Sequence, residues 1–173
     1  VHPYRATLAT KILKVPENKV RVVALDVGGS FGMKSPIYNE GPLCLWASRL
    51  IGRPVKWMGD RSESFLSDYA GRDNITTAEL ALDKQGKFLG FRVNTLAGLG
   101  AYIGGATPNP AINNLGTLAG VYTIPAICVN VTGVLTNNNP VTPYRGAGRP
   151  EAAFVIERTI DLAADELGID PAE

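Results

Sequence analysis

The chain has 173 residues, of which 45% are hydrophobic and 19% charged, and its formal net charge at pH 7 is +1. This composition is typical of a soluble globular protein that is long enough to form a sizeable core. Because the net charge is so close to zero, electrostatics gives no reason to expect nucleic acid or an anionic membrane as a partner. No segment approaches the roughly 20 apolar residues needed to cross a bilayer, so we expect no membrane span.

The first part of the chain alternates helical and extended patterns. The predicted elements are a helix over Pro3–Leu13, a strand over Val20–Leu25, a helix over Pro42–Leu50, a strand over Val55–Met58 and a polar turn or short helix over Asp60–Ser67. Both helices have proline in their first turn, where its missing N–H costs nothing. Gly52 is placed to end the second helix.

The second part predicts a hairpin, a further strand and a long helix. The predicted segments are strands over Ile75–Leu82 and Phe88–Leu96, a surface loop over Gly98–Pro110, a strand over Ala126–Leu135, a loop over Pro140–Gly148 and a helix from Pro150 to Leu167. The turn Asp83–Gly86 joins the first two strands, and Gly168 caps the helix. We therefore expect an α+β fold, with a mixed sheet and packed helices, in a single domain.

A glycine-rich loop follows the first predicted strand directly. Val27–Ser35 read V-G-G-S-F-G-M-K-S. Glycine adopts backbone shapes that a Cβ forbids and lets a ligand approach the main chain, and successive N–H groups in such a loop can hold an anion. The sequence thus indicates a site for phosphate or another oxyanion, with a tight turn that binds nothing as the alternative. The ring of Phe31 would then pack the loop into the core.

The same loop is a near miss for a nucleotide-binding P-loop. Gly28, Lys34 and Ser35 are correctly spaced, but Met33 stands where the motif has its last glycine. Pro36 also disfavours helical backbone at the residue before it. A P-loop-like nucleotide-binding domain is therefore kept only as an alternative, beside a non-catalytic scaffold domain.

A second loop combines glycine with arginine. Thr142–Pro150 read T-P-Y-R-G-A-G-R-P. The guanidinium of Arg145 offers a planar fork for a carboxylate, carbonyl or phosphate, and Gly146 next to it leaves room for a ligand. The alternative is a structural ion pair between Arg145 and Asp26 or Asp73.

The remaining reactive residues point to no site of their own. Cys44 and Cys128 lack metal-binding or redox spacing, and we expect both to be buried thiols in a cytoplasmic protein. His2 is the only histidine, so no Ser-His-Asp or Cys-His set exists, and we expect no metal held by side chains. The chain begins at Val1 without methionine, and we expect it to be part of a longer protein.

Three stretches together resemble one family, the large molybdopterin-binding subunit of the molybdenum hydroxylases. They are Lys19–Lys34 (K-V-R-V-V-A-L-D-V-G-G-S-F-G-M-K), Pro54–Asp73 (P-V-K-W-M-G-D-R-S-E-S-F-L-S-D-Y-A-G-R-D) and Pro143–Ala152 (P-Y-R-G-A-G-R-P-E-A). The family includes xanthine dehydrogenase, aldehyde oxidase and aerobic carbon monoxide dehydrogenase. The order and separation of the stretches also fit, and the resemblance covers essentially the whole chain.

The resemblance implies that residues 1–173 form the first half of a molybdopterin-binding region, with no second domain in this chain. It implies an oxidoreductase with a molybdenum–pyranopterin cofactor, as molybdopterin or its cytosine dinucleotide form. FAD and [2Fe-2S] clusters would lie on partner subunits or domains, and the rest of the large subunit would complete the site. The substrate would be an aldehyde, an N-heterocycle or a related small molecule, or carbon monoxide without a Mo–Cu site. The isolated chain would be inactive.

The resemblance also assigns residues. It implies substrate orientation by Arg145 and cofactor contact by seven residues of the two loops: Gly28, Gly29, Ser30, Phe31, Gly32, Gly146 and Ala147. We therefore expect both loops on one face of the domain. Purine-hydroxylating members have Glu where this chain has Ser35, and copper-dependent members have Cys where it has Gly146. Both departures argue against those two specialised sites.

Overall fold

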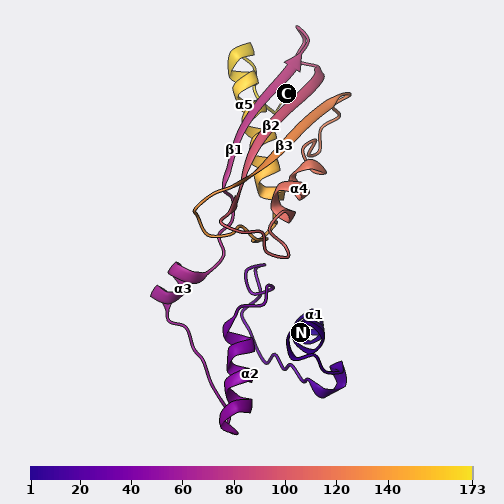
Figure 1. Ribbon diagram of the computed structural model, residues 1–173. Helices are drawn as coiled ribbons and strands as arrows, with labels where there is room; N and C mark the ends of the chain where they lie inside the picture. Colours follow the sequence, from indigo (N-terminus) through magenta and orange to yellow (C-terminus); the bar gives the residue numbers. More distant parts are fainter. Residues whose placement is uncertain (173) are drawn as a thin grey trace. The chain divides into compact units, whose positions relative to one another are not determined.

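The computed structural model describes residues 1–172 (Figure 1). These residues form two compact units, Val1–Asp68 and the part from Tyr69 onward, which are described separately. The expected α+β class, with a mixed sheet and packed helices, is confirmed. No helix within the described residues is long and apolar enough to cross a membrane.

The first unit is helical. Its elements are α1 (His2–Thr7), a π-helical turn (Leu8–Leu13), a 3-10 turn (Glu17–Lys19), α2 (Glu40–Ile51) and α3 (Arg61–Ser67). The predicted helices at Pro3–Leu13, Pro42–Leu50 and Asp60–Ser67 are thus confirmed, the first of them with a π-helical second half. Gly52 ends α2 at a φ of 67°, and the Asp60 carboxylate caps α3 by accepting a hydrogen bond from the Glu63 amide at 2.8 Å.

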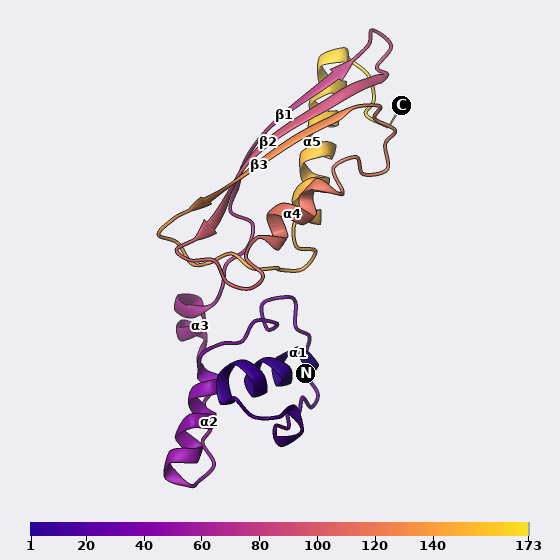
Figure 2. The same cartoon turned by 45° about the vertical axis from the view of Figure 1, so that its right-hand side comes forward.

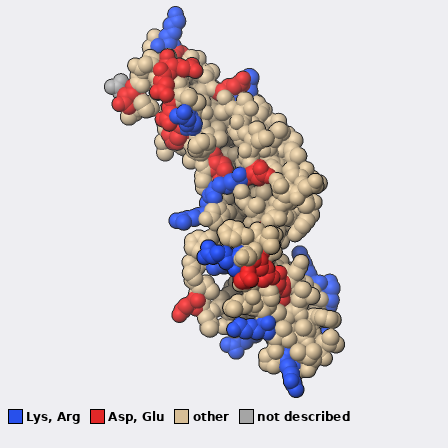
Figure 3. Space-filling view, turned by 90° about the vertical axis from the view of Figure 1, so that its left-hand side faces the viewer, with Lys and Arg blue, Asp and Glu red and all other residues tan. Residues whose placement is uncertain are grey.

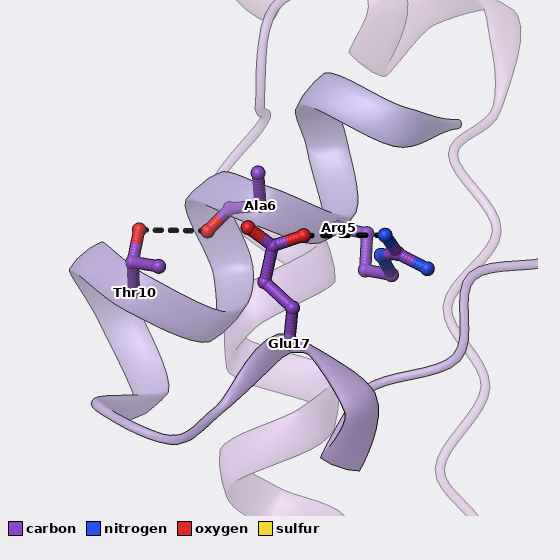
Figure 4. A network of polar contacts seen from close by, with 4 residues as sticks. All are labelled: Arg5, Ala6, Thr10 and Glu17. Atoms are coloured by element: carbon purple, nitrogen blue, oxygen red, sulfur yellow. Dashed lines mark hydrogen bonds and ion pairs between the residues drawn. The ribbon is translucent and has the colours of Figure 1, made fainter.

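Polar contacts secure the start of this unit (Figure 4). The Arg5 guanidinium donates to the Glu17 carboxylate at 3.2 Å, which ties α1 to the 3-10 turn. The Thr10 hydroxyl donates to the Ala6 carbonyl at 2.8 Å. Only Leu8 and Ala9 are fully buried in the first unit, so its own apolar core is very small.

Two predicted strands of the first unit are wrong. Val20–Leu25 and Val55–Met58 are not strands in the structure, and Leu25 is 83% exposed instead of buried. A strand needs a neighbour to pair its N–H and C=O groups, and the described residues of this unit contain none. The β-branched run still favours extended backbone, as at Val20 with φ −119° and ψ 127°.

The second unit contains a three-stranded mixed sheet in the order β1-β2-β3. Its strands are β1 (Asn74–Leu82), β2 (Phe88–Gly100) and β3 (Ile127–Leu135). β1 and β2 form the predicted antiparallel hairpin, whose turn is fixed by the Asp83 carboxylate accepting from two amides at 2.9 Å. β3 runs parallel to β2. All three predicted strands are confirmed, and β2 extends to Gly100.

Two helices cover one face of this sheet, as Figures 1 and 2 show. They are α4 (Asn109–Leu115) and α5 (Arg149–Leu167). The predicted C-terminal helix is confirmed with its Gly168 cap, whereas α4 lies partly in the segment predicted as a loop. The core between sheet and helices consists of Phe91, Val93, Leu118, Ala152 and Ile156.

The other face of the sheet carries exposed side chains. Arg92 and Glu79 form an ion pair there at 3.0 Å, and Cys128 is opposite Arg92 in the register. The expectation that Cys128 is buried is therefore wrong, because β3 turns this side chain away from the helices. Cys44 is half-buried. Acidic and basic side chains are interspersed on the face shown in Figure 3.

Candidate functional site

The glycine loop is irregular, as predicted, and is closed by its own hydrogen bonds. Gly29, Phe31 and Gly32 all have positive φ, at 123°, 51° and 91°. The Lys34 amide donates to the Ser30 carbonyl at 3.2 Å, and the Ser35 amide donates to the Gly32 carbonyl at 3.0 Å. Positive φ favours glycine, so the backbone of Phe31 is strained. The strained residue lies where the resemblance implies ligand contact.

Phe31 does not pack into a core within the first unit. Its side chain is 48% exposed, and its ring lies against Gly29, where an added Cβ would come within 2.8 Å of a ring carbon. The core-packing interpretation of Phe31 is therefore wrong. The absence of a Cβ at Gly29 is what allows the ring to fold over the loop.

The glycine loop has free main-chain donors. Within the first unit, the amide N–H groups of Gly28–Gly32 have no acceptor, and a Cβ at Gly28 would meet no atom within 4 Å. A hollow of about 500 Å³ begins at Met33 and Lys34, directly after the loop, and is also lined by Tyr4. Burial, followed by the charges of nearby Cys44 and Glu40, raises the pKa of Tyr4. Free amides beside open space can hold an anion such as a phosphate group.

The second loop enters α5 through three consecutive residues with positive φ. They are Gly146, Ala147 and Gly148, at 97°, 47° and 95°. The Ala147 amide donates to the Tyr144 carbonyl at 2.9 Å, and the Arg149 amide donates to the Gly146 carbonyl at 3.2 Å. These bonds define a tight turn directly before the N-terminus of α5.

The second loop packs closely on α4. A Cβ at Gly148 would overlap the carbonyl oxygen of Pro110 and lie 3.0 Å from the Asn114 amide nitrogen. Asn114 is 2% exposed. A Cβ at Gly146 would come within 2.5 Å of the Pro150 ring. Both glycines are therefore required by packing as well as by backbone conformation.

Arg145 presents an exposed guanidinium at this loop. Within the second unit, the guanidinium forms no ion pair with a carboxylate, so the alternative pairing with Asp73 is not formed. The backbone of Arg145 is held in place, because its carbonyl accepts a hydrogen bond from Nη2 of Arg72 at 2.8 Å. Among the described residues of the second unit, the charged group therefore has no anionic partner.

Sequence reasoning assigned no role to Arg72. Its guanidinium carbon lies 4.8 Å from the centroid of the Tyr144 ring, and its Nε lies 3.7 Å from a carboxylate oxygen of Glu151 in the first turn of α5. The G-R-D run at Gly71–Asp73 is part of a matched stretch, but only the structure reveals what Arg72 contacts.

The predicted site residues thus fall into two groups. Gly28, Gly29, Ser30, Phe31 and Gly32 share the loop of the first unit, and Arg145, Gly146 and Ala147 share the loop of the second. That the two loops lie on one face of the domain stays a prediction. The described residues contain no cluster of three or more His, Cys, Asp or Glu side chains that could hold a metal ion.

Comparison with known proteins gives one consistent family. The model of the molybdopterin cofactor-binding domain matches residues 1–173. The 6-hydroxypseudooxynicotine dehydrogenase complex subunit gamma of Paenarthrobacter nicotinovorans is 38% identical over 173 residues, which are 100% of this chain and 22% of that protein. The carbon monoxide dehydrogenase large chain of Hydrogenophaga pseudoflava is 40% identical over 170 residues, which cover 96% of this chain and 21% of that protein.

A solved structure agrees in fold. Quinoline 2-oxidoreductase from Pseudomonas putida 86 matches with a TM-score of 0.90 and 33% identity, covering 96% of this chain and 21% of that chain. The fold is thus shared with a domain of a known oxidoreductase. More particularly, the chain belongs to the molybdopterin cofactor-binding domain family of the molybdenum hydroxylases, and it spans about a fifth of the length of these relatives.

Proposed function

We propose that this chain forms the first half of the molybdopterin cradle in the large subunit of a multi-subunit molybdenum hydroxylase. Iron–sulfur clusters and FAD would lie on partner subunits or domains, and the rest of the large subunit would complete the site. The observation that supports this most strongly is the glycine loop, whose amides at Gly28–Gly32 have no acceptor within the first unit. A cofactor rich in phosphate and carbonyl oxygens supplies such acceptors.

The glycine loop would hold the cofactor mainly through its backbone. A site made of main-chain N–H groups is already oriented before the ligand binds, so little free energy is lost in ordering it. The half-exposed ring of Phe31 adds an apolar surface beside these donors. The Ser30 hydroxyl lies within hydrogen-bond distance of the Ser35 hydroxyl, at 3.0 Å. This contact links the middle of the loop to its end.

Arg145 would orient the substrate. When bound, the molybdenum centre supplies the redox chemistry that takes electrons from the substrate toward the partner cofactors. The guanidinium of Arg145 donates hydrogen bonds to a substrate oxygen or nitrogen and stabilises negative charge that develops there. Gly146 and Ala147 leave space beside it because they have no side chain or only a methyl group.

The substrate class we favour is an aldehyde or an N-heterocycle. Ser35 lacks the carboxylate with which Glu would hold a purine at this position, and Gly146 lacks the thiolate of a Mo–Cu site. Carbon monoxide oxidation without copper is the remaining option within the same family. Because this chain holds only part of the site, we expect no turnover by the chain alone.

The test is to purify the whole enzyme complex and to measure its molybdenum content and turnover together. We expect molybdenum near one atom per large subunit, oxidation of aldehydes or N-heterocycles with an artificial electron acceptor, and little activity on xanthine. A complex with full-length large subunit but no molybdenum would contradict the proposal and favour the scaffold alternative. Xanthine as the best substrate would contradict the assigned substrate class.

A further inference from the structure

The segment before β1 is paired with the segment before the Arg145 loop. Ala70 and Val141 form an isolated parallel bridge. The Ala70 amide donates to the Pro140 carbonyl at 3.0 Å, and the Thr142 amide donates to the Ala70 carbonyl at 3.0 Å. This pairing fixes the register of the two segments, so that Arg72 lies beside the second loop.

From this place Arg72 makes three contacts at once. Its Nη2 donates to the carbonyl of Arg145 at 2.8 Å. Its guanidinium carbon lies over the Tyr144 ring, 4.8 Å from the ring centroid, and its Nε lies 3.7 Å from the Glu151 carboxylate. One planar cation therefore joins the loop to the first turn of α5. Lysine has no planar fork and cannot make the three contacts together.

The Glu151 end of this arrangement is well shielded. The Glu151 side chain is only 14% exposed, and its buried Oε2 has no hydrogen-bond partner among the described residues. A nearly buried carboxylate needs a nearby positive charge. Arg72 supplies that charge, and its attraction to Glu151 is less screened by solvent than that of an exposed ion pair.

The backbone of Arg72 gives an independent sign of constraint. Its φ is 60°, in the left-handed region that non-glycine residues rarely adopt. The neighbouring Gly71 packs tightly against the same loop, since a Cβ there would lie 3.2 Å from Cβ of Tyr144. A strained conformation persists only when the surrounding contacts require it. Here those contacts are with the Arg145 loop.

We infer that Arg72 is a positioning residue, which acts on the substrate only through Arg145. The inference rests on the proposed function of Arg145. By holding the Arg145 carbonyl, Arg72 fixes the peptide plane between Arg145 and Gly146, and hence the direction in which the Arg145 side chain leaves the backbone. Without Arg72, this carbonyl would lose its hydrogen bond, and the conformational freedom of Gly146 would allow the peptide more than one orientation.

The experiment uses the complete enzyme with Arg72→Gly and Arg72→Lys, and Arg92→Lys as the matched control. Glycine accepts the left-handed backbone of residue 72 and so separates loss of contacts from misfolding. Arg92 also forms an ion pair, with Glu79 at 3.0 Å, but on the exposed face of the sheet.

We expect hydrogen exchange of the Ala147 and Arg149 amides to accelerate about tenfold in Arg72→Gly, with exchange in the middle of α5 unchanged.

Kinetics then separates positioning from a merely structural role. We expect kcat/KM to fall about ten- to a hundredfold in both Arg72 variants, as misplacement of a contact residue does, and to stay at wild-type level in Arg92→Lys. Arg72→Gly should also lower Tm, because it leaves the shielded Glu151 carboxylate without a cation, whereas Arg72→Lys keeps the charge and should change Tm little. In an Arg145→Lys background, Arg72→Gly should have little further effect, because both changes remove the same function.

Unchanged amide exchange in Arg72→Gly would overturn the inference, and so would additive effects in the double variant. If instead Arg145→Lys alone leaves kcat/KM intact, the proposed role of Arg145 fails, and the claim that Arg72 acts through Arg145 fails with it. The exchange measurement still decides by itself whether Arg72 holds the loop.

Discussion

Gly148 lies so close to Pro110 that a Cβ at residue 148 would overlap the Pro110 carbonyl oxygen. This contact joins the second loop to α4 and leaves no space for any side chain. The loop that carries Arg145 is thus seated on the helical layer of the second unit before any ligand is present.

Gly148→Ala should destabilise the second unit by about 2–4 kcal/mol, because a left-handed φ of 95° is unfavourable for alanine and the methyl group has no room. The matched control is Gly168→Ala, where φ is also positive, at 70°, but the space is open. That change should cost only about 1 kcal/mol. Denaturant unfolding measures both, and equal losses would contradict the packing argument.

Arg145→Lys in the complete enzyme should lower kcat/KM about tenfold or more with little change in Tm, since lysine keeps the charge but lacks the planar fork. Arg158→Lys is the control, because Arg158 is an exposed arginine of α5 paired with Asp161 at 3.7 Å. Steady-state kinetics beside thermal melts decides the outcome. An intact kcat/KM with a lowered Tm would make Arg145 a structural residue.

Phe31→Ala should reduce cofactor content while costing only about 1 kcal/mol or less of stability. A fully buried Phe would cost about 3–5 kcal/mol, but this side chain is 48% exposed. Phe65→Ala on α3 is the control, since Phe65 is 77% exposed and lies outside the loop. Molybdenum analysis of both variants is the measurement, and full occupancy in Phe31→Ala would remove the ring from the site.

Tyr122 provides a pH-dependent contribution to stability. Its hydroxyl donates to the Glu157 carboxylate at 2.6 Å, and this hydrogen bond, followed by burial and the charges of Glu157 and Asp161, raises the pKa of Tyr122. Because the pKa of Tyr122 is higher in the folded state than in the unfolded state, the hydrogen bond contributes fully to stability below about pH 10, the ordinary pKa of tyrosine. This contribution is lost as pH rises through the raised pKa.

Tyr122→Phe should therefore melt below the wild type at pH 7, and this difference in Tm should shrink as pH rises above about 10. The control is Tyr102→Phe, at an exposed tyrosine. Thermal melts across this pH range are the measurement. A difference in Tm that is the same at pH 7 and at the alkaline end would show that the Tyr122–Glu157 hydrogen bond contributes nothing.

The second unit was predictable because its signals are local. The hairpin follows from a turn whose Asp83 side chain binds its own backbone, and α5 follows from a regular apolar stripe with proline at its start and Gly168 at its end. In contrast, α4 is one short helix among prolines and asparagines, with no stripe long enough to identify it.

The failures in the first unit have a different cause. Val20–Leu25 has the composition of a buried strand, but composition does not provide the neighbour that a strand needs. Likewise, the sequence of the loop showed that Phe31 is unusual, but it did not show that the ring is exposed. Arg72 was missed because its role depends on a pairing between Ala70 and Val141, which are far apart in the sequence.

Cofactor content tests most directly whether the glycine loop binds the molybdopterin cofactor, as we propose. Molybdenum and pterin should be measured per large subunit in the wild type, in Gly29→Ala and in Gly52→Ala. Both glycines have positive φ, but only at Gly29 would a methyl group meet the Phe31 ring in the loop. We predict near-stoichiometric cofactor in the wild type and Gly52→Ala and a clear loss in folded Gly29→Ala. Equal cofactor content in all three proteins would contradict the account.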